Sequence, residues 1–137
     1  MSYLLDTNAC IALINGTPAP VRRRLQRTVE DGGEVFTSSV VMFELWYSVD
    51  KSSRPQANSD RVAIFLSGPV GVLPFDDTDA RAAGSIRAAL ETSGRPIGAY
   101  DLLIAGQALS RQLTLVTANV KEFSRVKGLN WEDWAKA

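Results

Sequence analysis

Short apolar runs alternate with longer helical segments along the whole chain, and this alternation constrains the fold more than any other feature. Strands are predicted at 3–5, 35–37, 70–75 and 114–117, with a final strand near 129–131. Helices are predicted between them, at 11–14, 18–31, 40–50, from about 58 to 66, from about 79 to 92, and at 99–111. Such alternation is typical of α/β proteins with a largely parallel sheet flanked by helices. The length of 137 residues fits one domain, so we expect a single α/β domain over residues 1–137.

Polar residues stand where several of these helices begin. Ser38 or Ser39 is placed to cap the helix at 40–50, and Asp77 or Asp79 to cap the helix that starts near 79. The polar stretch 51–58 contains a proline and is predicted to be a loop.

Ligands of parallel sheets bind at the carboxyl ends of the strands. Asp6 follows the first predicted strand, and the turn Ala118-Asn119 follows the strand at 114–117. This edge of the sheet is therefore where we expect a functional site.

The sequence contains no histidine, and this absence excludes several kinds of site. A Ser-His-Asp or Cys-His nucleophile relay is ruled out, as is a general acid–base pair built on imidazole. Zinc sites built on histidine, or on several cysteines, are excluded as well. Any reaction must therefore use carboxylates, hydroxyls, lysine, arginine or a hard metal ion.

Cysteine usage, the N-terminus and charge bear on location and partners. The single Cys10 can form no internal disulfide, which suits a reducing cytoplasm. The first residues lack a basic region, and Asp6 interrupts their apolar run, so neither a signal peptide nor a membrane helix is expected.

Fifteen basic and fifteen acidic residues give zero net charge. That balance argues against a broad basic nucleic-acid surface but allows a local patch.

Three carboxylates each stand alone in a segment that should supply core. Asp6 is the only charged side chain between Met1 and Val21, and Glu44 and Asp101 interrupt two apolar helices in the same way. An unpaired carboxylate in an apolar site costs several kcal/mol or more, so convergence on a shared cation would explain all three. Oxygen ligands alone point to Mg²⁺ or Mn²⁺. The alternative is structural: Asp6 caps a helix, and each of the other acids faces solvent.

Five stretches in order along the chain resemble those of PIN-domain ribonucleases, and within that family the VapC toxins of bacterial toxin–antitoxin pairs. The stretches are Leu5-Asp6-Thr7-Asn8, Ser38-Ser39 with Glu44-Leu45, Ile97-Gly98-Ala99-Tyr100-Asp101 with Leu103-Ile104-Ala105, Leu115-Val116-Thr117-Ala118-Asn119 with Glu122-Phe123, and Val126-Lys127-Gly128-Leu129 with Glu132-Asp133-Trp134.

The resemblance implies a metal-dependent endoribonuclease, with Asp6, Glu44 and Asp101 as ligands of Mg²⁺ or Mn²⁺. The fourth acidic position departs from the pattern, because many relatives have an aspartate where this turn reads Ala118-Asn119. Glu122 is the next acid and is the candidate to replace it, and the number of metal ions, one or two, stays open. The residues expected to support the site are Thr7, Asn8, Thr117 and Asn119.

The resemblance also implies partners: a structured RNA such as tRNA, a VapB-type antitoxin and a second copy of the chain. The basic residues nearest the expected site, and therefore candidates for RNA contact, are Lys121, Arg125 and Lys127. Arg22, Arg23, Arg24 and Arg27 are interpreted as a solvated helix face. Four large apolar residues could line an antitoxin groove, although core packing is the default reading for each: Phe43, Trp46, Tyr47 and Phe65.

Parts of the sequence are also compatible with two other functions. A catalytically weak PIN-like module that binds RNA or a partner would explain the altered turn at Asn119, but not the intact set of three acids. A carboxylate-based phosphatase or phosphoacceptor domain would need a second acid close after the first, whereas Asp6 is followed by Thr7-Asn8.

Overall fold

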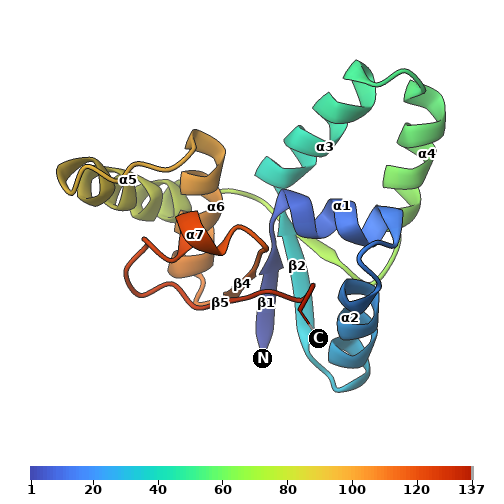
Figure 1. Ribbon diagram of the computed structural model, residues 1–137, viewed down its shortest axis with the longest axis horizontal. Helices are drawn as coiled ribbons and strands as arrows, with labels where there is room; N and C mark the ends of the chain where they lie inside the picture. Colours follow the sequence, from blue (N-terminus) through green and yellow to red (C-terminus); the bar gives the residue numbers. More distant parts are fainter. Residues whose placement is uncertain (137) are drawn as a thin grey trace.

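The computed structural model describes residues 1–136 and contains one five-stranded sheet in which every pairing is parallel (Figure 1). Its strand order is β3-β2-β1-β4-β5. The strands are β1 (Ser2–Leu5), β2 (Glu34–Ser38), β3 (Gly71–Leu73), β4 (Thr114–Val116) and β5 (Trp131–Glu132). The predicted α/β class and parallel sheet are therefore confirmed.

The register of the three strands β1, β4 and β5 places their ends in one row. Leu5 pairs with Val116, and Val116 pairs with Glu132. The ladder continues one residue further, because the Asp6 amide donates to the Val116 carbonyl at 3.1 Å and the Thr117 amide donates to the Glu132 carbonyl at 2.9 Å. The residues that follow these strands therefore emerge side by side at the carboxyl edge of the sheet.

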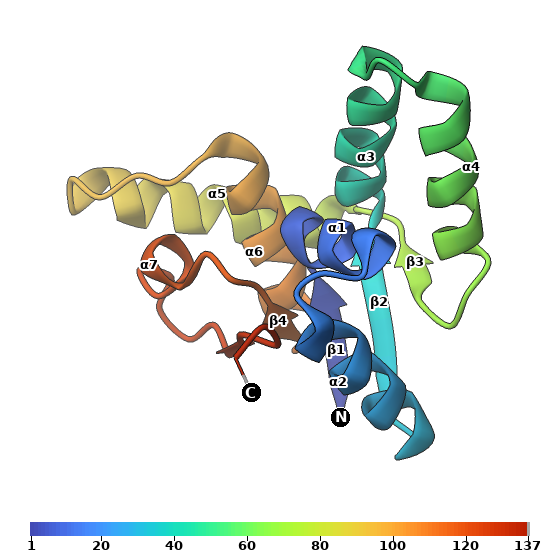
Figure 2. The same ribbon diagram turned by 45° about the vertical axis from the view of Figure 1, so that its right-hand side comes forward.

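Helices connect the strands. They are α1 (Thr7–Asn15), α2 (Ala19–Glu30), α3 (Ser39–Lys51), α4 (Pro55–Leu66), α5 (Asp77–Thr92), α6 (Ala99–Ser110) and α7 (Val120–Phe123). Helices α3 and α4 stand as one pair, while α5 and α6 lie together on the other side of the molecule (Figure 2). Gly106 allows α6 to approach α5 closely, because a Cβ there would lie 2.7 Å from the Cβ of Ala83.

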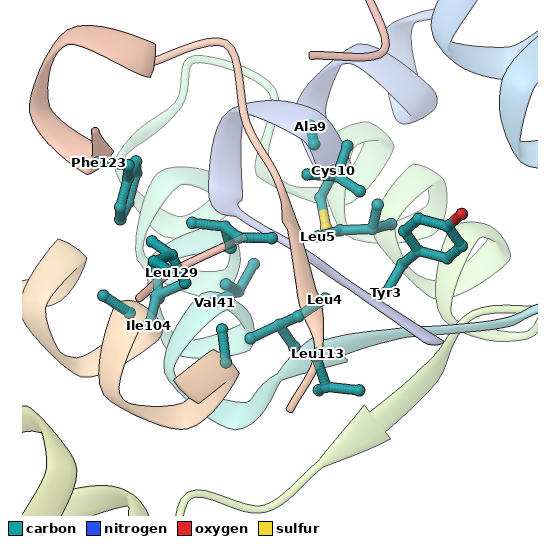
Figure 3. Close-up of a cluster of buried hydrophobic side chains, with 14 of the residues drawn as sticks. Tyr3, Leu4, Leu5, Ala9, Cys10, Val41, Ile104, Leu113, Phe123 and Leu129 are labelled. Atoms are coloured by element: carbon teal, nitrogen blue, oxygen red, sulfur yellow. The ribbon is translucent and has the colours of Figure 1, made fainter. Parts of the chain in front are cut away.

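The core is formed by the central strands and the helix faces packed on them (Figure 3). Leu4 and Leu5 of β1 and Leu115 of β4 are fully buried, as the short apolar runs predicted. Cys10 is also fully buried, and burial raises the pKa of its thiol to about 12. It therefore contributes to packing rather than to thiolate chemistry.

Several predicted boundaries and caps were wrong. Helix α4 begins at Pro55, inside the predicted loop, because proline suits the first turn of a helix. Strand β3 is shorter than predicted, β5 lies slightly later in the chain, and the short α7 was not predicted. Ser38 caps α3, as one of the two alternatives proposed. The cap of α5 is Asp76 rather than Asp77 or Asp79, and Asp79 completes a capping box with it.

No helix within residues 1–136 is both long enough and apolar enough to cross a membrane.

Candidate active site

Asp6 leaves the end of β1 at the centre of the sheet edge and is 4% exposed. Its Oδ1 accepts a hydrogen bond from the Ala9 amide at 2.8 Å, so Asp6 caps α1 as the structural alternative proposed. That bond occupies one oxygen of the carboxylate. Capping therefore fixes the orientation of Asp6, and a contact with the Thr117 side chain adds to it.

Glu44 lies on α3 and is held by a neighbour of Asp6. The Thr7 hydroxyl donates to Glu44 Oε1 at 2.7 Å, which connects the first turn of α1 to the middle of α3. Glu44 is half-buried, and its charge raises the pKa of Asp6. Glu44 thus faces Asp6 rather than open solvent.

Asp101 and Glu122 complete the group from α6 and α7. Asp101 lies in the first turn of α6, within hydrogen-bonding reach of Glu122. The Asn119 side-chain amide donates to Glu122 Oε2 at 3.1 Å. The sequence left open whether Asn119 or Glu122 fills the fourth position. In the structure Asn119 orients the carboxylate of Glu122, and the acid itself reaches Asp101.

The electrostatics show that these four acids share one site. Burial raises the pKa of Asp101 to about 7, and the contact with Glu122 and the charges of Asp6 and Glu44 add to the effect. Burial also raises the pKa of Asp6, although hydrogen bonds to Thr117 and Ala9 oppose that shift. Within the described chain, none of the four acids forms an ion pair with a lysine or arginine. The site therefore holds concentrated negative charge that the protein does not neutralise.

A divalent cation fits this donor set by its chemistry. The group (Asp6, Glu44, Asp101 and Glu122) offers only oxygen ligands, which Mg²⁺ and Mn²⁺ prefer. Over residues 1–136, no three acids are arranged to hold an ion as their side chains stand. The negative charge that no lysine or arginine of the described chain offsets would attract such a cation.

The supporting residues lie around the same edge of the sheet. Thr117 is buried, hydrogen-bonds Asp6 and accepts from the Asn119 amide at 2.9 Å. Thr7 holds Glu44, as described above. Asn8 is exposed and lines a cavity beside the site. Each of these predicted residues therefore lies at or next to the four acids.

The basic residues near the site differ in what they do. Lys121 and Lys127 are exposed. Arg125 is partly buried, and its Nη1 donates to the Pro96 carbonyl at 3.0 Å, so this arginine fixes the loop before α6. Arg22 donates to the Leu13 carbonyl at 3.0 Å. These bonds give both arginines structural contacts that the spacing of charges did not indicate.

The four aromatic residues on α3 and α4 only partly follow the default expectation of core packing. Trp46 and Phe65 pack against the core. Phe43 and Tyr47 are 54% and 57% exposed, so core packing was the wrong interpretation for these two. Phe43 contacts Tyr100 of α6 with ring centroids 5.6 Å apart.

Sequence reasoning missed one acid. Asp133 directly follows β5, and its charge raises the pKa of Asp6. The sequence signal for Asp133 is its position directly after the last strand. Asp6 and Thr117 hold the same position after β1 and β4. The predicted strand near 129–131 ended too early to show that alignment.

Comparison with known proteins identifies the family. The model of the PIN domain matches residues 3–129. The chain belongs to the PIN-domain family. Within it, the chain is 43% identical to "tRNA(fMet)-specific endonuclease VapC" of Shigella flexneri, over 98% of this chain and 99% of that protein. It is 38% identical to "Ribonuclease VapC2" of Rickettsia felis, over 99% and 100% of the two chains.

Solved VapBC structures share the fold of this PIN domain. VapBC from Salmonella typhimurium, in a DNA-bound crystal structure, matches with a TM-score of 0.90 and 40% identity, over 98% of each chain. VapBC2 from Rickettsia felis, bound to a DNA fragment from its promoter, also has a TM-score of 0.90, at 36% identity, covering 96% of this chain and 98% of that one. The chain is thus a VapC-type PIN domain, as the ordered motifs predicted.

Proposed function

We propose that this chain is a metal-dependent endoribonuclease toxin that hydrolyses phosphodiester bonds of a structured RNA. The observation that carries this proposal is the convergence of four carboxylates without a cationic partner at the carboxyl edge of the sheet. Transfer RNA is the proposed substrate, because the Shigella flexneri relative carries the name of a tRNA(fMet)-specific endonuclease. We further propose that residues 1–137 act as a single domain.

The proposed ligands of Mg²⁺ or Mn²⁺ are Asp6, Glu44 and Asp101, with Glu122 as the fourth acid. When bound, the ion would lower the pKa of a water molecule and offset negative charge on the phosphate. The chain's own residues set the geometry. Ala9 fixes Asp6, Thr7 fixes Glu44, and Asn119 fixes Glu122. Hydrogen bonds of this kind, from residues that do not themselves touch the ion, orient the side chains that bind it.

Hydrolysis by water has a definite chemical consequence. Because no ribose hydroxyl acts as the nucleophile, the products carry 5′-phosphate and 3′-hydroxyl ends. RNA approach requires that cations offset the acidic site. Lys121 and Lys127 are the proposed contacts, since both are exposed, and Arg125 contributes mainly by holding the loop that leads to Asp101.

The proposed partners follow from the VapBC assemblies with which this chain shares its fold. We propose that a VapB-type antitoxin neutralises this chain, that the toxin forms a homodimer, and that both act in the cytoplasm. The exposed Phe43 and Tyr47 on α3 offer apolar surface for such contacts.

Incubation of the purified protein with total RNA tests the proposal. Reactions contain Mg²⁺, Mn²⁺ or excess EDTA, and the ends of the products are mapped. We expect cleavage only with metal, with 5′-phosphate ends. Cyclic 2′,3′-phosphate ends, or full activity in EDTA, would contradict the mechanism. RNA binding without cleavage under every condition would instead support the alternative of a non-catalytic binding module.

A further inference from the structure

A cavity of about 320 Å³ lies beside the acidic site, between α1, α2 and the segment that follows β5. Its walls are mainly apolar and include Ala9, Ala12, Val21 and Trp134. The cavity adjoins Asp6, because two residues of its wall contact that side chain: the Ala9 amide donates to Asp6 Oδ1, and Thr117 lies against the Asp6 carboxyl group. A ligand in this cavity would therefore lie next to Asp6, one of the proposed metal ligands.

One carboxylate in the cavity wall comes from Asp133, and the sheet register sets its position. Leu5, Val116 and Glu132 form one row across β1, β4 and β5. In the next row, Asp6 and Asp133 flank Thr117. Residues in register on neighbouring strands point to the same face, and strands lie about 4.8 Å apart. Asp133 is thus about 10 Å from Asp6, measured between their backbones across two strand spacings.

Several contacts hold Asp133 in place. Its Oδ1 accepts from the Ala135 amide at 2.9 Å. On one side of it, Glu132 accepts from Arg24 of α2 at 2.8 Å and from Trp134 Nε1 at 3.0 Å. The Arg24 guanidinium also lies 5.4 Å from the centre of the Trp134 ring. These contacts anchor residues 132–135 beside α2.

The second oxygen of Asp133 is available to a ligand. Its Oδ2 accepts no hydrogen bond from any group in residues 1–136, and Asp133 forms no ion pair within this part of the chain. An apolar cavity with a fixed, unpaired acceptor suits a flat ligand that carries a hydrogen-bond donor at its edge. RNA bases that leave their stack have this character, and aspartate accepts from the amino group of cytosine.

We propose that this cavity receives one nucleobase of the RNA substrate, adjacent to the cleaved bond, and that Asp133 accepts a hydrogen bond from its exocyclic amino group. The inference rests on the proposed ribonuclease function and adds base selection to it. Adenine, cytosine and guanine carry an amino group. Uracil presents carbonyl oxygens on both sides of its single N–H, and the carboxylate repels them. Asp133 therefore selects against uracil at this position.

Cleavage of base-substituted RNAs tests the selection. End mapping first locates the cleaved bond, and each base is then placed in turn on either side of it. We expect the wild-type protein to cleave with uracil about tenfold more slowly at one of the two positions. Asp133→Asn should reduce that ratio to near one, because an amide both donates and accepts. Asp50→Asn, an exposed acid on α3, serves as the control and should keep the wild-type ratio.

The outcomes separate the two proposals. An unchanged base preference in Asp133→Asn overturns the base pocket, even if the wild-type protein is an active ribonuclease. Absence of cleavage by the wild-type protein overturns the proposed function instead. A binding measurement then examines the cavity without reference to catalysis.

Nuclear magnetic resonance titration with cytidine and uridine 5′-monophosphates provides that measurement, because these probes share sugar and phosphate and differ only in the base edge, with an amino group at C4 in cytosine and a carbonyl at C4 beside a protonated N3 in uracil. We expect cytidine monophosphate to shift the amide signals of Ala9, Ala12 and Ala135, and uridine monophosphate to shift them far less. Ala12→Met, which fills the cavity, should abolish the shifts. Ala88→Met, at an exposed position of α5, should not. Equal shifts with both nucleotides, or shifts that survive Ala12→Met, overturn the proposal, as would cavity signals that respond to antitoxin but to neither nucleotide.

Discussion

Two groups of acidic side chains in this protein differ in whether the protein provides a cation to neutralise them. At the start of α5, Asp79 is fully buried but receives hydrogen bonds from the Ser110 hydroxyl, the Asp76 amide and the Arg111 guanidinium. At the carboxyl edge of the sheet, Asp6 and Asp101 receive no cation from the described residues.

The pKa shifts follow this difference. The contacts from Arg111 and Ser110 outweigh burial and lower the pKa of Asp79. Burial and neighbouring acids raise the pKa of Asp101 to about 7. A carboxylate that the protein neutralises contributes to the fold, whereas carboxylates left unneutralised are available to a ligand. Burial of an acid alone therefore does not mark a functional site here; the absence of an internal partner does.

The largest expected effect is on catalysis. Asp6→Asn removes a proposed metal ligand while keeping an oxygen that accepts from Ala9, so folding should be preserved. We expect ribonuclease activity to fall by more than about 100-fold, beyond the loss typical for residues that only orient a ligand. Initial cleavage rates on a mapped RNA substrate measure the change. Asp79→Asn is the control, and the specific activity of its folded fraction should stay near that of the wild type. Comparable losses in both variants would erase the distinction between the two acidic groups.

The next effect is on stability and should appear only in the α5 group. Arg111→Met leaves Asp79 buried without its cation and also removes the 2.7 Å bond to the Pro74 carbonyl. We expect the free energy of unfolding at pH 7 to fall by about 2–3 kcal/mol, somewhat less than for a fully buried pair because Arg111 is partly exposed. Urea titration provides the value. The loss should shrink below about pH 4, where Asp79 becomes protonated in the unfolded chain. A stability equal to that of the wild type would show that the pair contributes nothing.

A smaller effect concerns pH and metal. The pKa of Asp101 rises from 3.8 to about 7 on folding, so its stabilising contribution is fully present below pH 4 and is lost as pH rises through 7. The metal-free protein should therefore lose about 1–2 kcal/mol between pH 5 and 8, after allowance for solvent screening. Added Mg²⁺ should raise Tm more at pH 8 than at pH 5. Thermal unfolding of the wild type and Asp101→Asn tests this, and the variant should show a weaker dependence on both pH and metal.

The sequence predicted the parallel sheet and singled out most residues of the candidate site for a physical reason. Buried strands in a parallel sheet are short apolar runs, and a charge inside such a run is conspicuous because burial penalises it. Asp6, Glu44 and Asp101 were identified by that contrast. The sequence pattern supported a role for Glu122 less strongly, since this residue lies beside Lys121 in a polar segment. The ordered motifs were needed to single it out.

The features that sequence reasoning missed depend on contacts between distant residues. Strand β5 has only two residues, so its pairing with β4, rather than any local pattern, determines that Asp133 joins the row of Asp6. The choice of Asp76 as the α5 cap depends on Asp79 turning inward to meet Arg111, which comes from the end of α6. Neither the β4–β5 pairing nor the choice of cap produces a periodic pattern in the sequence.

The smallest expected effect compares single hydrogen bonds in the two groups. Asn119→Ala removes the donor to Glu122, which is half-buried, and a net hydrogen bond of this kind contributes about 1 kcal/mol. Activity should fall by about fivefold, with little change in Tm, because Glu122 remains present but less well oriented. Ser110→Ala removes a donor to Asp79 and should show the reverse, with stability lowered by about 1 kcal/mol and unchanged specific activity. Specific activity and stability are measured in parallel for Asn119→Ala and Ser110→Ala to test this contrast. If Asn119→Ala lowers stability as much as Ser110→Ala does, the Asn119–Glu122 contact supports the fold rather than the geometry of the site.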